Sequence, residues 1–255
     1  MIAELTGARV HYVDEGSGPP VVFLHGLAAD VDTWRDQARR IADRYRTVRL
    51  DLRGHGQSST PPGPWSIADL AGDVAELCAR LSIARAHFVG HSAGGVVAVR
   101  LAIDRPDLVA SLCLVATAAE CNQKAANDFY LRWAGIAEAE GMLATLRAMG
   151  VKREVDGSSL GDPLGFARAS RAIATLYPEP LTPRLAALDC PGLVIVGDKD
   201  WIGAGGAVKA SRALRGSELV ILPGLGHLPF LQDPDGFHAR LVAFLDRVSA
   251  GEAAR

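Results

Sequence analysis

The feature that most constrains the fold is a Gly-His-Ser-Ala-Gly motif at residues 90–94, which lies where a predicted strand meets a predicted helix. An apolar run at 86–89 precedes the motif, and an apolar helical pattern at 93–103 follows it. The chain must reverse within a few residues, so we expect Ser92 to hold a strained backbone conformation. The flanking glycines keep the strand and the helix from colliding. This arrangement predicts a serine hydroxyl at the carboxyl edge of a sheet, with the Ala93 N–H at a helix N-terminus, where it favours an anion. The alternative is a glycine-rich helix start with a capping serine.

Short apolar strands alternate with helical patterns on both sides of this motif, which predicts a mainly parallel sheet with helices on both faces. The predicted strands are residues 8–14, 21–24, 47–50, 86–89, 108–115, 193–196 and 218–222. The predicted helices outside the middle of the chain are residues 32–42, 66–81, 93–103, 206–214 and 234–248, and residues 249–255 are expected to fray. Ser66, followed by Asp69 three residues later, is the expected cap of the second of these helices.

The middle of the chain carries helical patterns only. We expect helices at 122–138, 141–149 and 163–176, with a break at Gly157, Ser158 and Ser159 between the last two. The sequence therefore predicts two parts: a core formed by 1–117 and 188–255, and a helical insertion at 118–187 over one edge of the sheet.

Composition and charge exclude several classes of protein. The hydrophobic fraction is 49% and the charged fraction is 22%, which is typical of a globular domain. The formal net charge of -2 gives no reason to expect nucleic acid and argues against a polybasic membrane-surface segment. The four cysteines have no metal-site spacing, and Cys78 and Cys113 are expected to be buried thiols. No signal peptide or membrane-spanning run is evident. We expect a cytoplasmic protein, monomeric or homodimeric, that acts on a small molecule.

A serine hydroxyl is a weak nucleophile near neutral pH and needs a base. The candidate is His227, in a glycine-containing loop after the last predicted strand. His91 neighbours the serine, and we expect its side chain to point away along the turn. His87 is a poor rival because it begins a predicted buried strand, and His11, His55 and His238 are expected to have surface or packing roles. A histidine base needs an acid partner. Asp200 is favoured, Asp198 is the alternative that would cap the turn, and Glu120 is a third choice.

An oxyanion needs two N–H donors. Ala93 supplies one, and the loop Leu24-His25-Gly26-Leu27 is placed to supply the other. Gly26 lets the backbone turn so that the Leu27 N–H faces the serine. We expect His25 to brace this loop.

Taken together, the motifs resemble the α/β-hydrolase superfamily from about Arg9 to Phe244. The matching features, in order, are His25-Gly26 after a strand, the stretch Asp51-Leu52-Arg53-Gly54-His55-Gly56-Gln57-Ser58, the serine motif, Gly197-x-x-Asp200, and His227-x-Pro229 with Asp233-Pro234 and Phe237. The resemblance implies an eight-stranded sheet with a helical cap at 118–187. It supports Asp200 as the acid, and it implies a structural role for 51–58. Within the superfamily, the sequence looks like small capped carboxylesterases and enol-lactonases, and it lacks a proline shortly after Asp200.

Three functions remain open from the sequence. The first is a serine hydrolase that cleaves an ester or lactone through an acyl-enzyme, without metal or cofactor. The second is a carbon–carbon bond hydrolase of ring-fission products that uses the same residues, and the third is a ligand-binding receptor on this scaffold. The candidate pocket residues are His25, Phe129, Trp133, Trp201 and Leu228; aromatic rings in the cap could equally serve to bury it against the core. Cations that could bind a substrate carboxylate, or lie on solvated helix faces, are Arg132, Lys152, Arg153, Arg168 and Arg171.

Overall fold

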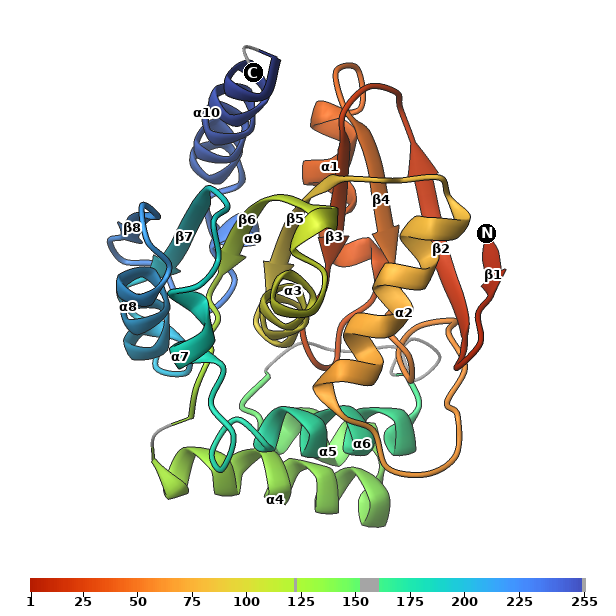
Figure 1. Cartoon of the computed structure of the whole chain (residues 1–255). Helices are drawn as coiled ribbons and strands as arrows, with labels where there is room; N and C mark the ends of the chain where they lie inside the picture. Colours follow the sequence, from red (N-terminus) through yellow and green to blue (C-terminus); the bar gives the residue numbers. More distant parts are fainter. Residues whose placement is uncertain (122, 152–160, 254–255) are drawn as a thin grey trace.

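A computed structural model describes residues 1–121, 123–151 and 161–253 of the chain (Figure 1). Its centre is one eight-stranded sheet with the strand order β1-β2-β4-β3-β5-β6-β7-β8. The pairs β1–β2 and β2–β4 are antiparallel, and all other neighbouring strands of the sheet are parallel. The strands are β1 (Ile2–Glu4), β2 (Arg9–Glu15), β3 (Pro20–Leu24), β4 (Arg46–Leu50), β5 (Ala86–His91), β6 (Val109–Val115), β7 (Gly192–Gly197) and β8 (Glu218–Leu222). The predicted α/β-hydrolase fold is confirmed.

The strands β3 and β7 carry no polar side chain because helices cover both faces of the sheet. Side chains alternate along each strand, so Val22 and Leu24 belong to one buried cluster while Val21 and Phe23 belong to the other. The first cluster includes residues of α2 (Ile67–Arg80), α3 (Ala93–Asp104) and α8 (Ala204–Ala213). The second cluster includes residues of α1 (Arg35–Ile41), α9 (Pro229–Gln232) and α10 (Pro234–Ala253). Short 3-10 helices precede α1 and β6, namely Val31–Trp34 and Pro106–Leu108.

Between β6 and β7, the described residues form helices and loops without a strand. Figure 1 shows α4 (Lys124–Glu140), α5 (Met142–Ala148) and α6 (Pro163–Ala174) lying together beyond the end of the sheet toward which β4 and β5 point. Their contact is a small apolar cluster of its own: Trp133, Ala134, Ala137, Met142, Phe166 and Ala167. A shorter helix, α7 (Thr182–Leu185), returns the chain to the sheet. The predicted break at Gly157, Ser158 and Ser159 lies outside the described residues.

Several local predictions can be compared directly with the structure. The cap of α2 is confirmed: the Asp69 N–H donates to the Ser66 hydroxyl (3.2 Å) and the Ser66 N–H donates to the Asp69 carboxylate (2.7 Å). Cys78 and Cys113 are buried free thiols, as expected. The expectation that the chain frays from Ser249 is wrong, because α10 continues to Ala253. Within the described residues, no helix combines the length and the apolar character that a membrane span requires.

Candidate active site

The turn between β5 and α3 has the strained geometry expected from the serine motif. Ser92 has φ 52° and ψ -118°, in a region that residues with a side chain rarely occupy. A Cβ on Gly90 would lie 2.6 Å from the Gly94 carbonyl oxygen, and a Cβ on Gly94 would lie 2.4 Å from the Leu24 carbonyl oxygen. The glycines are therefore required for the close approach of strand, helix and neighbouring strand.

The Ser92 side chain does not cap the helix that it precedes, which contradicts the capping alternative. Its main chain is held on both sides: the N–H donates to the Val115 carbonyl (2.9 Å), and the carbonyl accepts from the Thr117 hydroxyl (2.6 Å). No sequence signal marked Thr117 for this role. Ser92 lines a cavity of about 470 Å³.

Asp200 and His227 form a hydrogen-bonded pair in the loops after β7 and β8. The His227 Nδ1 lies 3.1 Å and 3.0 Å from the two carboxylate oxygens of Asp200. The carboxylate is fully buried, whereas the imidazole side chain is 24% exposed. Burial raises the pKa of Asp200, but the hydrogen bonds from His227 and from the Gly203 and Ile202 N–H groups outweigh it, so the pKa of Asp200 lies below its usual value.

The acid loop takes its shape from a glycine rather than from a proline. The N–H groups of Ile202 and Gly203 both donate to the Asp200 Oδ1, each at 3.0 Å. A Cβ on Gly203 would lie 2.6 Å from the Asp200 Oδ2 and 2.8 Å from the Ala116 carbonyl oxygen. Gly203 was not singled out in the sequence, although its position three residues after the acid was a usable signal.

The two rival acids are engaged elsewhere. The Asp198 carboxylate accepts the Gly224 N–H (2.7 Å) and so closes the turn, as predicted for this residue. Glu120 forms an ion pair with Lys209 (2.6 Å) on the wall of the cavity. Neither residue bonds to His227.

The structure brings the loop after β3 against the serine. A Cβ on Gly26 would lie 3.1 Å from the Ser92 Cβ, and Ala28 holds a left-handed backbone (φ 56°). Ala93 begins α3, where the first N–H groups of a helix lack intrahelical acceptors. Among the described residues, no hydrogen bond from the Leu27 N–H or the Ala93 N–H is found. The N–H groups of Leu27 and Ala93, each one residue along the chain from Gly26 and from Ser92, are therefore without a described acceptor.

The His25 side chain braces the loop after β3 through two hydrogen bonds, as expected. Its Nε2 accepts the Leu52 N–H (3.0 Å), so its Nδ1 carries the proton and donates to the Gly26 carbonyl (2.7 Å). Burial lowers the pKa of His25 and favours this neutral form. The ring is fully buried and does not line the cavity beside Ser92.

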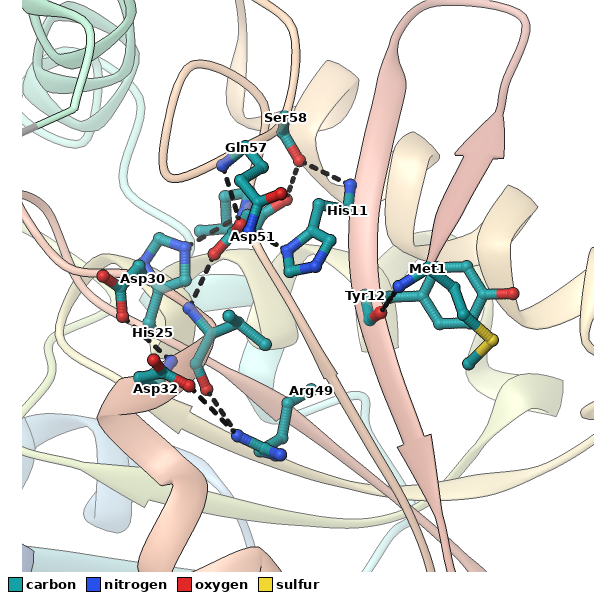
Figure 2. Close-up of polar contacts among 12 residues, drawn as sticks. Met1, His11, Tyr12, His25, Asp30, Asp32, Arg49, Asp51, Gln57 and Ser58 are labelled. Carbon is teal, nitrogen blue, oxygen red and sulfur yellow. Dashed lines mark hydrogen bonds and ion pairs between the residues drawn. The ribbon is translucent and has the colours of Figure 1, made fainter. Parts of the chain in front are cut away.

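The stretch 51–58 forms the polar support of the same loop (Figure 2). The buried Asp51 carboxylate accepts the N–H groups of Val31 (2.6 Å) and Gln57 (2.9 Å), and it contacts the His11 Nδ1 at 2.8 Å. These contacts are structural, which agrees with the role expected for this stretch.

The cavity lies between the serine turn, the β6–α4 connection, the start of α8 and the helices α4 and α6. Its wall includes Ser92, Ala93, Phe129, Trp133 and Trp201, but not Leu27 or Leu228. Trp201 is 68% exposed and packs edge-on to Phe129 with ring centroids 6.0 Å apart. Trp133 is almost fully buried in the helical cluster, so it serves both the cap and the cavity.

Of the candidate cations, Arg171 pairs with Glu138 (2.6 Å) and Arg168 donates to the Pro61 carbonyl (2.8 Å). Neither lines the cavity. Lys152 and Arg153 lie outside the described residues. Across the parts of the chain that the structure describes, no group of three histidine, cysteine, aspartate or glutamate side chains is arranged to hold a metal ion.

Comparison with known proteins agrees with the observed fold. The enol-lactonase from Burkholderia xenovorans LB400 superposes with a TM-score of 0.88 at 28% identity, covering 96% of this chain and 100% of that chain. A thermophilic esterase from Thermogutta terrifontis superposes with a TM-score of 0.83 at 28% identity, covering 94% of each chain. The dihydrolipoyllysine-residue acetyltransferase component of the acetoin cleaving system of Cupriavidus necator is 45% identical over 114 residues, which are 44% of this chain and 30% of that protein.

Residues 19–160, more than half of the chain, match the family described as alpha/beta hydrolase fold. This match and the eight-stranded sheet establish that the chain belongs to the α/β-hydrolase family and is a hydrolase.

Proposed function

We propose that the chain is a serine hydrolase that cleaves a carboxylic ester or lactone of a small, largely apolar substrate through an acyl-enzyme. The observation that carries the proposal is the buried Asp200 carboxylate bonded to His227, in the same site as a strained serine whose side chain is not used for capping. The similarity to an enol-lactonase and to an esterase supports the same substrate class.

The proposed reaction has two steps. The Ser92 oxygen attacks the substrate carbonyl carbon while the His227 Nε2 takes the hydroxyl proton, and the Leu27 and Ala93 N–H groups stabilise the oxyanion. Collapse of the tetrahedral intermediate breaks the bond to the leaving oxygen, which receives the proton from His227. Water then attacks the acyl carbon while His227 takes a proton from it, and collapse of the second tetrahedral intermediate breaks the bond to the Ser92 oxygen. That oxygen receives the proton from His227, and the acid product leaves.

Asp200 fixes the tautomer that this sequence of steps requires. Because the carboxylate can only accept, the His227 Nδ1 carries a proton and Nε2 presents its lone pair. Among the described residues, neither His227 nor a carboxylate of the site forms a hydrogen bond to the Ser92 hydroxyl. The proposed reaction therefore requires the serine and the imidazole to move closer together when substrate binds. Such tightening is common in hydrolases between the free and the substrate-bound enzyme.

The cavity supports an apolar substrate with limited polar contact. Val96, Ile173 and Leu176 line it together with the aromatic rings, and Glu120 and Lys209 form one polar stretch of its wall. A cavity of about 470 Å³ falls within the range of roughly 300–1,000 Å³ that is usual for small-molecule sites.

The test is turnover of a panel of short p-nitrophenyl esters, lactones and ring-fission dienones by the wild-type protein and by Ser92→Ala. We expect ester or lactone hydrolysis that the substitution reduces about 10⁴-fold or more. A fluorophosphonate should label the wild type at Ser92, as read by mass spectrometry. Turnover confined to dienones would favour the carbon–carbon hydrolase, and specific ligand binding without turnover or labelling would favour the receptor.

A further inference from the structure

The His91 side chain lies against the candidate base rather than away from the site. His91 is the last residue of β5 and is 4% exposed. Its ring packs beside the His227 ring, with centroids 4.8 Å apart, and edge-on to Phe230, with centroids 5.1 Å apart. The His91 Nε2 lies 2.9 Å from the carbonyl oxygen of His227. A residue next to the candidate nucleophile is therefore bonded to the backbone of the candidate base.

The chemistry of this bond fixes the protonation state of His91. A carbonyl can only accept, so the Nε2 carries a proton and donates it to His227. Burial lowers the pKa of His91 to about 3, with a further contribution from the neighbouring His227, so the ring is neutral near pH 7 and Nδ1 holds a lone pair. Two other titratable groups affect the pKa of His91: Asp200 raises it and His25 lowers it.

The lone pair of the His91 Nδ1 has no hydrogen-bond partner among the described residues. Gly26 approaches this nitrogen closely, since a Cβ on Gly26 would lie 2.9 Å from it. A buried polar atom without a partner is unfavourable, and an apolar side chain would avoid that cost. A gain elsewhere must offset it, and the bond from Nε2 is the available source.

The loop that carries His227 has few other contacts of this kind. Its hydrogen bonds to neighbouring elements are few: the Gly224 N–H donates to Asp198 (2.7 Å), the Leu225 carbonyl accepts from Lys199 (2.9 Å), and the Gly226 N–H donates to the Gln232 side chain (2.8 Å). Within the described chain, the His227 main chain itself has one hydrogen bond, and its partner is His91. None of the other bonds connects this loop to β5, the strand that ends directly before Ser92.

We propose that His91 is a positioning residue, which sets the distance between His227 and Ser92 by holding the His227 backbone against the end of β5. This inference rests on the proposed function of Ser92 and His227. The His91 side chain does not exchange protons with substrate. It acts through the main chain of its partner, and the same ring abuts the Gly26 backbone of the loop that carries the Leu27 N–H.

The test compares His91→Leu, which removes the donor at similar volume, with His91→Gln, which keeps an N–H donor at similar reach. We expect His91→Leu to lower kcat for a hydrolysed ester about 10- to 100-fold with KM changed less than about 2-fold, because misplacement of a reacting group by about 1 Å costs rates of that order. His91→Gln should recover most of the loss. His238→Gln, on α10, is the matched control and should keep the wild-type kcat.

A second measurement separates positioning from packing and does not need turnover. The proton shared by the His227 Nδ1 and Asp200 should give a downfield NMR signal, assigned by its loss in His227→Gln. We expect the signal to be present in the wild type and in His91→Gln, and to be broadened or lost in His91→Leu at temperatures where circular dichroism shows all three folded.

The outcomes decide between the two proposals. If the wild type hydrolyses esters and Ser92→Ala does not, an unchanged kcat in His91→Leu overturns the positioning role. An equal loss in the leucine and glutamine variants, with both folded, also overturns it. If Ser92→Ala keeps full turnover, the proposed function fails, and the NMR signal alone then decides whether His91 positions His227.

Discussion

Acidification from pH 7 to pH 5 should destabilise the folded chain, because buried histidines around the site cannot accept protons there. Burial lowers the pKa of His55 and of His91 to about 3, and it lowers the pKa of His25 in the same direction. In the unfolded chain these rings return to a pKa of about 6.5. The unfolded state therefore takes up protons first, so stability is full above about pH 7 and falls as the pH drops toward the folded pKa values.

The magnitude follows from proton linkage. A ring that stays neutral in the folded state and has a pKa of about 6.5 when unfolded loses about 2 kcal/mol of stability between pH 7 and pH 5. His55 and His91 together give about 4 kcal/mol, with a slope near pH 5 of about 2.7 kcal/mol per pH unit. This is a large share of the roughly 5–15 kcal/mol that stabilises a typical domain. Carboxylates with lowered pKa values, such as Glu76 and Asp69, lose their contribution below about pH 4.5, outside this window.

The assay is urea unfolding at pH 7, 6 and 5, followed by circular dichroism. His55→Leu should reduce the loss between pH 7 and pH 5 by about 2 kcal/mol, whatever its effect on stability at pH 7. The comparison across pH within one variant removes the packing cost of the substitution. An unfolding free energy that is equal at pH 7 and pH 5, or a leucine variant with the wild-type pH dependence, would refute the buried neutral state of these rings.

Two further predictions concern the site itself. Asp200→Asn should lower kcat about 10⁴-fold by favouring the wrong tautomer of His227, whereas Asp198→Asn should change it only a few-fold; steady-state ester hydrolysis at pH 7 measures both. Gly26→Ala should lower kcat about 10²- to 10³-fold, because its methyl would lie 2.9 Å from the His91 Nδ1 and 3.1 Å from the Ser92 Cβ. Gly72→Ala, a helix position with open space around it, is the control, and equal rates for the two alanine variants would contradict the proposed oxyanion loop.

The parts of the fold that sequence reasoning predicted are those set by neighbouring residues. The continuous apolar run Val21, Val22, Phe23 and Leu24 is visible in the chain and is typical of a strand buried on both faces, and the structure divides these residues between two buried clusters. The serine turn is equally local, since Gly90 and Gly94 are required by a reversal that lies within the motif. Periodicity and turn chemistry therefore placed the sheet and the candidate nucleophile.

The features of the fold and the site that sequence reasoning missed depend on contacts between distant segments of the chain. The strand β1 has three residues, too few for a period, and exists because it pairs with β2. The bond between His91 and His227 joins residues 136 positions apart. The acid loop was uncertain without its proline, and its shape follows from the approach of Gly203 to Asp200 and to the Ala116 carbonyl. No pattern within a single segment encodes such approaches.

The histidines near the site show why one of them suits proton transfer. A histidine that acts as a base becomes a cation when it takes up the proton. Its surroundings must stabilise that cation, which needs a carboxylate partner and some access to water. His25 and His91 are buried, and each gives its N–H to a backbone carbonyl, which provides no countercharge for a cation. His227 gives its N–H to the Asp200 carboxylate and keeps part of its ring exposed. Because His25 and His91 are neutral, they do not repel the imidazolium of His227. The environment of all three histidines therefore supports the proposal that His227 transfers the proton.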